Sequence, residues 1–417
     1  MRIKNNLIAT NTPDFIFLFL LSTFPLALIL GNFFINLFIF LFSINFLINF
    51  KKNKFIFKEI IFYLLVFFFI SLLINVFFSI DPENSLPRVI KIFFVIFFIF
   101  EIKRLTQKYE ENFKKYVYKS WFIIFLIISI DILFETIFGY NMIGNRSIMP
   151  GRISSFFGDE LVVGAFYHGF VLFFLSFLIF KKTKNYVVIF SIIFILVISF
   201  LIGERSNFIK LFLAITIFTS LVLRINYKIK LTGLLAIFLI LLGIINLSDS
   251  YNKRYFGEIK TLFSINGYKN YMKKSQHGAH RYTSMKILED NLIFGIGIKN
   301  FRFESANTKY ENKEYVKTDL RQANHPHQIH HEFLSETGIF GYITFLIFIF
   351  STLYFGFKSY LQSKNLYQLS AIIFMFTSVL PIIPSGSFLS SFTSGIFWLN
   401  FAVMVSFVKT KLTFNKS

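Results

Sequence analysis

Four of the seven histidines in this chain lie within one segment of seven residues, His325–His331. Imidazole is the side chain whose ordinary pKa places its change of charge near neutral pH, so a histidine can take up or release a proton there. The segment ends a long polar stretch and leads directly into an apolar run that begins near Gly338. This arrangement predicts acid–base chemistry at the point where a polar segment meets an apolar one.

Three arginines add a second kind of chemistry. Arg205 lies in the four-residue connection between two apolar runs, Arg281 begins an amphipathic piece of the polar stretch, and Arg152 precedes another apolar run. An arginine stays charged, and its planar guanidinium matches the geometry of phosphate oxygens. Arginines at the ends of apolar runs can also be simple anchors at lipid headgroups. Both interpretations stay open for Arg152, whereas the short connection around Arg205 favours phosphate binding.

The elements that must position these residues are apolar runs that recur along the whole chain. Of the 417 residues 55% are hydrophobic and 64 are Phe, and a soluble domain of this size carries more charge and far less Phe. We predict an all-α polytopic membrane protein with about twelve transmembrane helices. They are expected at residues 14–31, 33–50, 59–78, 88–102, 118–138, 160–180, 186–203, 207–223, 231–247, 338–357, 366–384 and 388–408.

The connections between these runs differ in charge. With a cytoplasmic N-terminus, the cytoplasmic segments carry 23 Lys and Arg residues, whereas the short outer loops carry only Arg88, Arg146, Arg152 and Arg205. This is the bias of the positive-inside rule, and it supports both the number of spans and their orientation. The first apolar run lacks a small-residue cleavage site, so it is expected to be an anchor and not a removed signal peptide.

One connection is far longer than the others and divides the chain into three parts. These are spans one to nine at residues 1–247, a large outer loop at 248–337, and the last three spans with a cytoplasmic tail at 338–417. The loop holds fourteen Lys and Arg residues, and because long loops escape the positive-inside rule, an anionic partner is the simplest reason for this charge. Its apolar positions predict short amphipathic helices, with Ser284–Asp290 lying on the membrane face.

Composition also excludes several classes of function. The net charge of +21 sits mostly in short loops between spans, which argues against a nucleic-acid partner, and the absence of cysteine excludes disulfides and thiol chemistry. The outer segments contain no Asp-x-Asp or paired-carboxylate motif of the kind that holds Mg²⁺. His327 and His331 could be zinc ligands if that segment is helical, but no His-Glu-x-x-His motif is present. We therefore predict no metal and no cofactor.

Several motifs, taken in order, resemble the O-antigen ligase family. His327, Glu336 and Gly338 are similar to its H-N-x7-E-x-G signature, with Gln328 in place of the usual Asn. The run from Glu289 to Phe301 is similar to the "dnPlfGvGxxnF" run of the family, with Leu292 where Pro is common. Two further stretches also resemble family motifs, the turn Gly203-Glu204-Arg205-Ser206 and the segment from Pro150-Gly151-Arg152 to Asp159-Glu160. The resemblance extends from about residue 140 to residue 350.

This resemblance implies a metal-independent membrane glycosyltransferase. Its expected reaction moves a glycan from undecaprenyl diphosphate to a sugar hydroxyl of the lipid A core, at the periplasmic face of the bacterial inner membrane. His327 takes the role of the catalytic base, and Arg205 and Arg281 that of a diphosphate clamp, with Arg152 as a further substrate-binding candidate. Glu336 and Gly338 are expected to be structural or supporting residues. The expected partners are the lipid-linked glycan donor, the glycan acceptor and membrane lipids.

Other interpretations remain beside this one. A polymerase of the same superfamily, which joins repeat units on the lipid carrier, would use similar cations and a similar late loop. A secondary transporter would suit twelve spans, but such proteins usually carry buried acids in their spans, and here Asp131 and Glu135 are the main examples. At single residues, we expect His277 and His280 to be solvated and Glu204 to form a local ion pair with Arg205.

Overall fold

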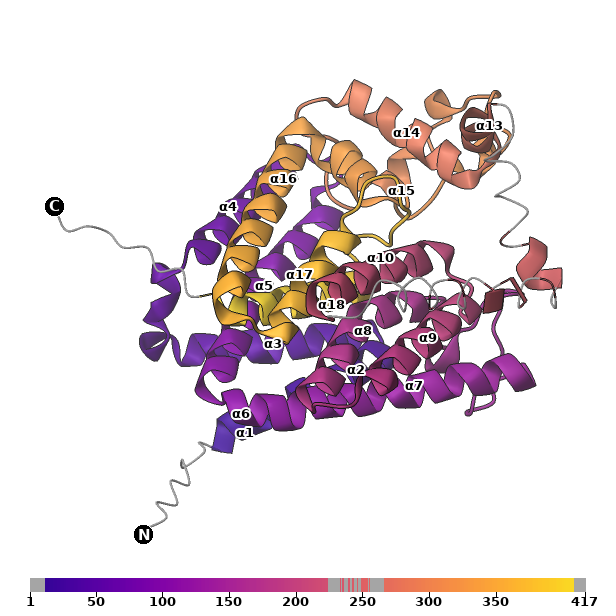
Figure 1. Ribbon diagram of the computed structural model, residues 1–417. Coiled ribbons are helices and arrows are strands. Elements are labelled where there is room, and N and C mark those ends of the chain that lie inside the picture. Colours follow the sequence, from indigo (N-terminus) through magenta and orange to yellow (C-terminus); the bar gives the residue numbers. More distant parts are fainter. Residues whose placement is uncertain are drawn as a thin grey trace, which may run out of the picture.

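The computed structural model describes residues 12–223 and 266–408, together with scattered helical positions between residues 233 and 255. In this part of the chain the regular elements are helices, and no β-strand is present (Figure 1). The α-helices with defined bounds are α1 (Thr12–Ser22), α2 (Phe24–Leu30), α3 (Asn32–Ile48), α4 (Ile60–Phe77), α5 (Pro82–Lys108), α6 (Glu110–Asn112), α7 (Tyr118–Phe138), α8 (Val163–Phe180), α9 (Asn185–Leu201), α10 (Arg205–Val222), α13 (Gly267–Lys274), α14 (Gln276–Asp290), α15 (Phe301–Glu304), α16 (Ile329–Ser363), α17 (Leu366–Ser378) and α18 (Ser391–Ser406).

The predicted all-α membrane class agrees with these helices, although fewer of them are long enough to cross a bilayer than the twelve predicted spans. Within the described residues five helices have the length and hydropathy to span a membrane: α4, α8, α10, α16, and the continuous stretch Glu110–Phe138 that contains α7. Counting each of two bent helix pairs as one span raises the number to seven. The predicted ninth span, 231–247, falls largely outside the described residues. The count of twelve therefore stays a prediction.

The first predicted span is not a straight helix, and the second ends in a bend. α1 and α2 meet at a bend of 57°, and α3 turns by 69° into the stretch Phe50–Lys58. Pro25 lies in the first turn of α2, where it has no amide hydrogen for the carbonyl of Leu21. That carbonyl accepts from the indole Nε1 of Trp121 at 2.9 Å, and the carbonyl of Ser22 accepts from Ser120 at 2.8 Å. The bend thus joins this segment to α7, which a uniformly apolar sequence does not reveal.

The predicted tenth span also begins earlier than expected, because α16 starts at Ile329 and not at residue 338. It is interrupted at Gly338, whose φ of 63° lies in the left-handed region. A helix with a left-handed residue loses backbone hydrogen bonds on both sides of it. The histidine segment therefore enters the bundle as the first, separately bent part of a long helix.

α13, α14 and α15 lie together at one edge of the molecule, at the upper right in Figure 1. We expected the second half of α14 to lie on the membrane face. Ile287 instead forms a small apolar core with Ile296, Phe301 and Tyr310. Residues after α14 therefore cover this apolar position, and the location of the stretch on the membrane face stays a prediction.

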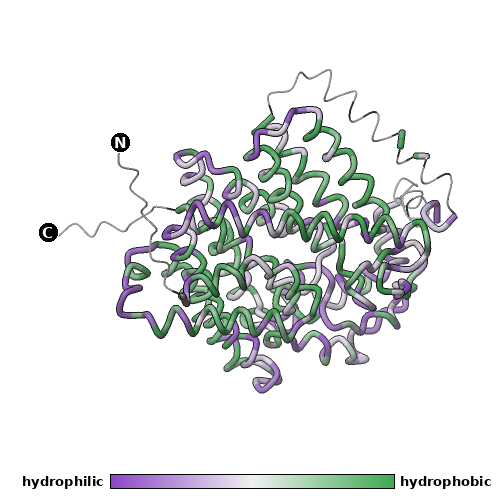
Figure 2. The backbone as a smooth tube through the Cα atoms, turned by 90° about the horizontal axis from the view of Figure 1, so that it is seen from below, coloured by the Kyte–Doolittle hydropathy of each residue, from purple (hydrophilic) through white to green (hydrophobic). Residues whose placement is uncertain are grey.

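Apolar residues are exposed on the outside of the helices as well as buried between them (Figure 2). Phe77, Phe190 and Phe350 are among the large apolar side chains on the outer surface. Extensive apolar exposure of this kind is unfavourable in water and normal for a surface that contacts lipid. The fold is therefore that of a helical membrane protein.

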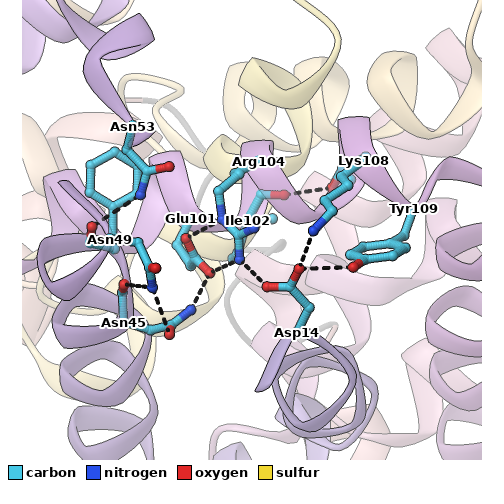
Figure 3. Close-up of polar contacts among 11 residues, drawn as sticks. Asp14, Asn45, Asn49, Asn53, Glu101, Ile102, Arg104, Lys108 and Tyr109 are labelled. Atoms are coloured by element: carbon cyan, nitrogen blue, oxygen red, sulfur yellow. Dashed lines mark hydrogen bonds and ion pairs between the residues drawn. The ribbon is translucent and has the colours of Figure 1, made fainter. Parts of the chain in front are cut away.

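A dense ionic network joins α1, α3 and α5 (Figure 3). Arg104 of α5 contacts Asp14 of α1 at 2.5 Å and Glu101 at 2.6 Å. Asp14 also accepts from Lys108 at 2.7 Å and from the hydroxyl of Tyr109 at 2.8 Å. Because opposite charges are matched within hydrogen-bond distance, this network ties three helices together.

Candidate functional site

The two arginine turns predicted from the sequence lie against each other. Gly203 has a φ of 76°, and a Cβ at this position would collide with the carbonyl oxygen of Gly151. The amide of Ile153 donates to the carbonyl of Ile202 at 3.1 Å. The glycines therefore allow a close backbone contact that brings Arg152 beside the start of α10, where Arg205 is the first residue.

Glu204 fixes this junction. Its carboxylate accepts from the guanidinium of Arg152 at 3.1 Å, from the amide of Gly164 at 3.1 Å and from Asn207 at 2.6 Å. A Cβ at Gly164 would come within 2.8 Å of the Glu204 side chain, so only glycine leaves room for it. The expected pairing of Glu204 with its neighbour Arg205 was wrong. The carboxylate forms its ion pair with Arg152 instead, which is far away in the sequence and is brought close by the packed turns.

Three imidazole rings gather around that of His327, which precedes α16. The ring centroid of His327 lies 4.2 Å from that of His325, 5.1 Å from that of His280 and 5.9 Å from that of His277. The backbone of His327 has a φ of 55°, a conformation that residues other than glycine rarely adopt. Its carbonyl accepts from the amide of Ser385 at 2.9 Å, which holds the backbone in this shape.

Burial and, to a smaller extent, the positive charge of a protonated His277 lower the pKa of His327 to about 4. The pKa of His280 is also lowered to about 4, chiefly by burial. Both imidazoles are therefore neutral at neutral pH, which is the form that can accept a proton. The expectation that His280 is solvated was wrong, because it is fully buried and its Nε2 lies 2.9 Å from the carbonyl of Leu320.

Gln328 explains how the chain accommodates its departure from the expected His-Asn pair. It is the N-cap of α16, and its side-chain oxygen accepts from the amide of His331 at 2.9 Å. Asparagine is among the strongest N-cap residues because its oxygen can satisfy a free amide at the start of a helix. The longer glutamine makes the same kind of contact here, so the helix start beside His327 is preserved.

Glu336 and Gly338 connect α16 to the run that follows α14. Around Gly338 the amides of Ile339 and Phe340 donate to the carbonyls of Leu292 and Ile293 at 2.9 and 3.1 Å. On the other side of the break, the carbonyl of Glu336 accepts from the amide of Gly297 at 2.8 Å.

The side chain of Glu336 points to the same run. Its carboxylate is 1% exposed and accepts from the amide of Lys299 at 2.8 Å. These contacts join the run from Glu289 to Phe301 to the start of α16, and so help to hold the histidine segment in place. Glu336 itself does not line the cavity described next.

A cavity of about 450 Å³ brings most of the predicted site residues together. Arg152, Glu204 and Arg205 line it from the packed turns, and His277, His325 and His327 line it from α14 and the loop before α16. The remaining wall is largely apolar and comes from α8, α17, α18 and the loop before α18: Leu161, Val162, Ala165, Phe374, Phe388, Phe392, Ile396 and Phe397.

Arg281 does not line this cavity. It is an exposed residue of α14, one turn after His277, and its guanidinium donates to the hydroxyl of Tyr268 at 2.5 Å. Of the three predicted arginines, the structure thus brings Arg152 and Arg205 to the cavity and leaves Arg281 on the outer surface.

Sequence reasoning missed two cavity residues that lie inside predicted spans. Lys210 of α10 and His168 of α8 are each 4% exposed. His168 lies 2.8 Å from the hydroxyl of Thr377 through its Nε2. A lysine near the end of an apolar run is ordinarily explained by its long side chain, which can extend to the lipid headgroups. The sequence signal that could have identified Lys210 as a site residue was its position about one turn after Arg205.

The described residues hold no group of three or more His, Asp or Glu side chains arranged to bind a metal ion. Three buried polar atoms of cavity-lining residues also lack a hydrogen-bond partner among the described residues. They are Nε of Arg152, Nε2 of His325 and Oγ of Ser385. Buried polar atoms are rarely left without a partner, so these three indicate a ligand or water in the cavity.

The model of a protein family described as O-antigen ligase matches residues 190–346, from the middle of α9 to the middle of α16. The matched range contains Arg205, Lys210, Arg281 and His327, whereas Arg152 lies before it. No curated protein matches the chain.

Proposed function

We propose that this chain, whose residues 190–346 match the family described as O-antigen ligase, transfers a glycan from undecaprenyl diphosphate to a sugar hydroxyl of the lipid A core. The observation that carries the proposal is the single cavity that Arg152, Arg205 and His327 line together. In this proposal the helices form about twelve spans of the bacterial inner membrane. The cavity and the segment 248–337 face the periplasm, where donor and acceptor meet.

The two walls of the cavity suit the two halves of such a donor. Arg152 and Arg205 lie at the start of α10, where the amides of the first helical turn add partial positive charge. The opposite wall is aromatic and aliphatic, with Phe374, Ile396 and Phe397 among its residues. A polyprenyl diphosphate has an anionic head and an apolar chain, and both find complementary surroundings here.

His327 acts as the base in this reaction. Its neutral imidazole takes the proton from the acceptor hydroxyl while the hydroxyl oxygen forms a bond to the anomeric carbon of the donor. The bond from that carbon to the diphosphate breaks, and its electron pair leaves with undecaprenyl diphosphate. Arg152 and Arg205 stabilise the negative charge that the leaving group gains.

A transfer assay with the purified protein, an undecaprenyl-diphosphate-linked glycan and a lipid A-core acceptor tests the proposal. Loss of a positioned base lowers rates by roughly 10²- to 10⁴-fold, so His327→Ala should lose activity on that scale. His330→Ala is the matched control, because His330 contacts Tyr342 and the carbonyl of Val379 and does not line the cavity. Full activity of His327→Ala would refute the assignment of the base.

The same assay distinguishes the ligase from the polymerase. A ligase attaches the glycan to the lipid A-core acceptor, whereas a polymerase extends the glycan on the lipid carrier when no such acceptor is supplied. Longer lipid-linked chains without acceptor would therefore replace our proposal by the polymerase. We also propose that the reaction needs no metal ion, so EDTA should leave the rate unchanged, and rescue of an EDTA-inhibited enzyme by Mg²⁺ would contradict this.

A further inference from the structure

Lys210 is a buried basic residue of the cavity that has no ion-pair partner among the described residues. It lies in the second turn of α10, it is 4% exposed, and it lines the cavity. Its ammonium group makes no hydrogen bond and no ion pair with the described residues, although Glu204 attracts it electrostatically. Burying a charged ammonium without a partner is costly, so a protein keeps such a group mainly where a ligand supplies the opposite charge.

The neighbouring groups do not supply that charge. The carboxylate of Glu204 already accepts from Arg152, Gly164 and Asn207. His168 contacts the hydroxyl of Thr377 through its Nε2 and carries no negative charge. Among the described residues that line the cavity Glu204 is the carboxylate, and it already pairs with Arg152, which leaves Lys210 without an ion pair there.

Lys210 lies further along α10 than Arg205, which it follows by five residues, or about 7.5 Å along the helix axis. α17, which packs against α10, places the apolar side chain of Phe374 in the same cavity. Arg152 and Arg205 precede Lys210 along the packed turns and α10, nearer to the outer loops. A diphosphate bound along this line would direct one phosphate to the two arginines and the other to Lys210.

We propose that Lys210 binds the lipid-side phosphate of the donor and makes the cavity selective for a diphosphate over a monophosphate. This inference rests on the proposed function. A diphosphate esterified at both ends carries one negative charge on each phosphate, so one phosphate can meet the arginines while the other meets Lys210. When the glycosidic bond breaks, the leaving group gains one more negative charge, which the same three cations hold.

Farnesyl diphosphate and farnesyl monophosphate are suitable probes, and their affinities can be measured by calorimetry on the full-length protein in detergent. A charge-assisted hydrogen bond to a buried partner corresponds to a change in affinity of roughly 10- to 100-fold. Lys210→Met should lower the affinity for farnesyl diphosphate by that factor and change the affinity for the monophosphate much less. Lys210→Arg should retain most of the selectivity. Unchanged diphosphate affinity in Lys210→Met would overturn the proposal.

Thermal unfolding separates a binding role from a structural one. Because Lys210→Met removes an unpaired buried charge, it should leave the melting temperature of the ligand-free protein unchanged or raise it. Lowered stability together with unchanged selectivity in Lys210→Arg and Lys210→Gln would assign the lysine to the fold and contradict the proposal. Lys91→Met is the matched control, since Lys91 donates to Ser394 at 3.0 Å and does not line the cavity.

The two proposals can fail separately. If the protein binds farnesyl diphosphate through Lys210 but transfers no glycan, the phosphate site stands and the transferase assignment is wrong. If the protein transfers glycan and the donor KM of Lys210→Met equals that of the wild type, the transferase stands and the role of Lys210 is wrong.

Discussion

The ionic network of α1, α3 and α5 and the cavity at the start of α10 use the same kinds of side chain with opposite charge balance. In the network, Arg104 bridges the carboxylates of Asp14 and Glu101, and Asp14 accepts from Lys108 as well (Figure 3). In the cavity, Glu204 is the carboxylate among the described lining residues and already pairs with Arg152, whereas Lys210 has no ion pair within the described residues. Matched charges hold helices together, whereas a buried cation without an ion pair is available to a ligand.

This contrast also separates stability from function. A buried ion pair is expensive to break because one charge is left without a partner, even where the intact pair adds little to stability. A buried cation without an ion pair has the opposite effect, since its removal relieves an unfavourable burial and affects ligand binding. Substitutions in the two regions should therefore change different measurable quantities.

The largest effect is expected from Arg205. Replacing one preorganised donor of an anion-stabilising site lowers rates by roughly 10²- to 10³-fold, so Arg205→Met should reduce kcat/KM for the lipid-linked donor on that scale. Initial rates of transfer at subsaturating donor measure it. Arg281→Met is the matched control, because Arg281 lies on the outer surface beside Tyr268. Equal losses in the two variants would place the phosphate site nearer to α14 than we infer.

A smaller and different effect is expected from Arg104. Arg104→Met leaves Glu101, which is fully buried, and Asp14 with fewer partners. Breaking a buried ion pair costs about 3 to 5 kcal/mol, so the free energy of unfolding should fall by about that much. The rate per folded molecule should remain near that of the wild type. Denaturant unfolding in detergent and the transfer assay together measure both quantities.

The double variant Arg104→Met/Glu101→Gln provides the control for this prediction, because it removes the unpaired charge and should regain part of the stability. If Arg104→Met instead lost activity while its unfolding free energy stayed unchanged, the contrast between the two regions would be wrong.

The smallest effect concerns pH. The pKa of His327 is lowered to about 4, so its imidazole is in the base form above this pH and becomes protonated as the pH falls through it. Between pH 6 and 8 we therefore expect kcat/KM to change little, and to decline only below about pH 5, because kcat/KM reports the ionisation of the free enzyme. A decline centred near pH 6.5, the ordinary pKa of histidine, would show that His327 is not buried as described.

Some features could be predicted from the sequence because they depend on neighbouring residues. The length and hydropathy of the apolar runs predicted α4, α7, α8, α9 and α10 to within a few residues. The bend between α1 and α2 was missed, because it depends on carbonyl groups that the distant residues Ser120 and Trp121 satisfy. The break at Gly338 was missed for the same reason, since the partners of the released backbone groups lie at Leu292 and Ile293.

The sequence by itself determined that this is a helical membrane protein with clustered histidines and arginines, since composition and spacing are local properties. Only the tertiary structure decided which of these residues meet. It placed Arg152, Arg205 and His327 at one cavity, left Arg281 outside, paired Glu204 with Arg152 and added Lys210. Contacts between residues so far apart in the chain arise from helix packing and close approaches at glycines, and no local pattern encodes them.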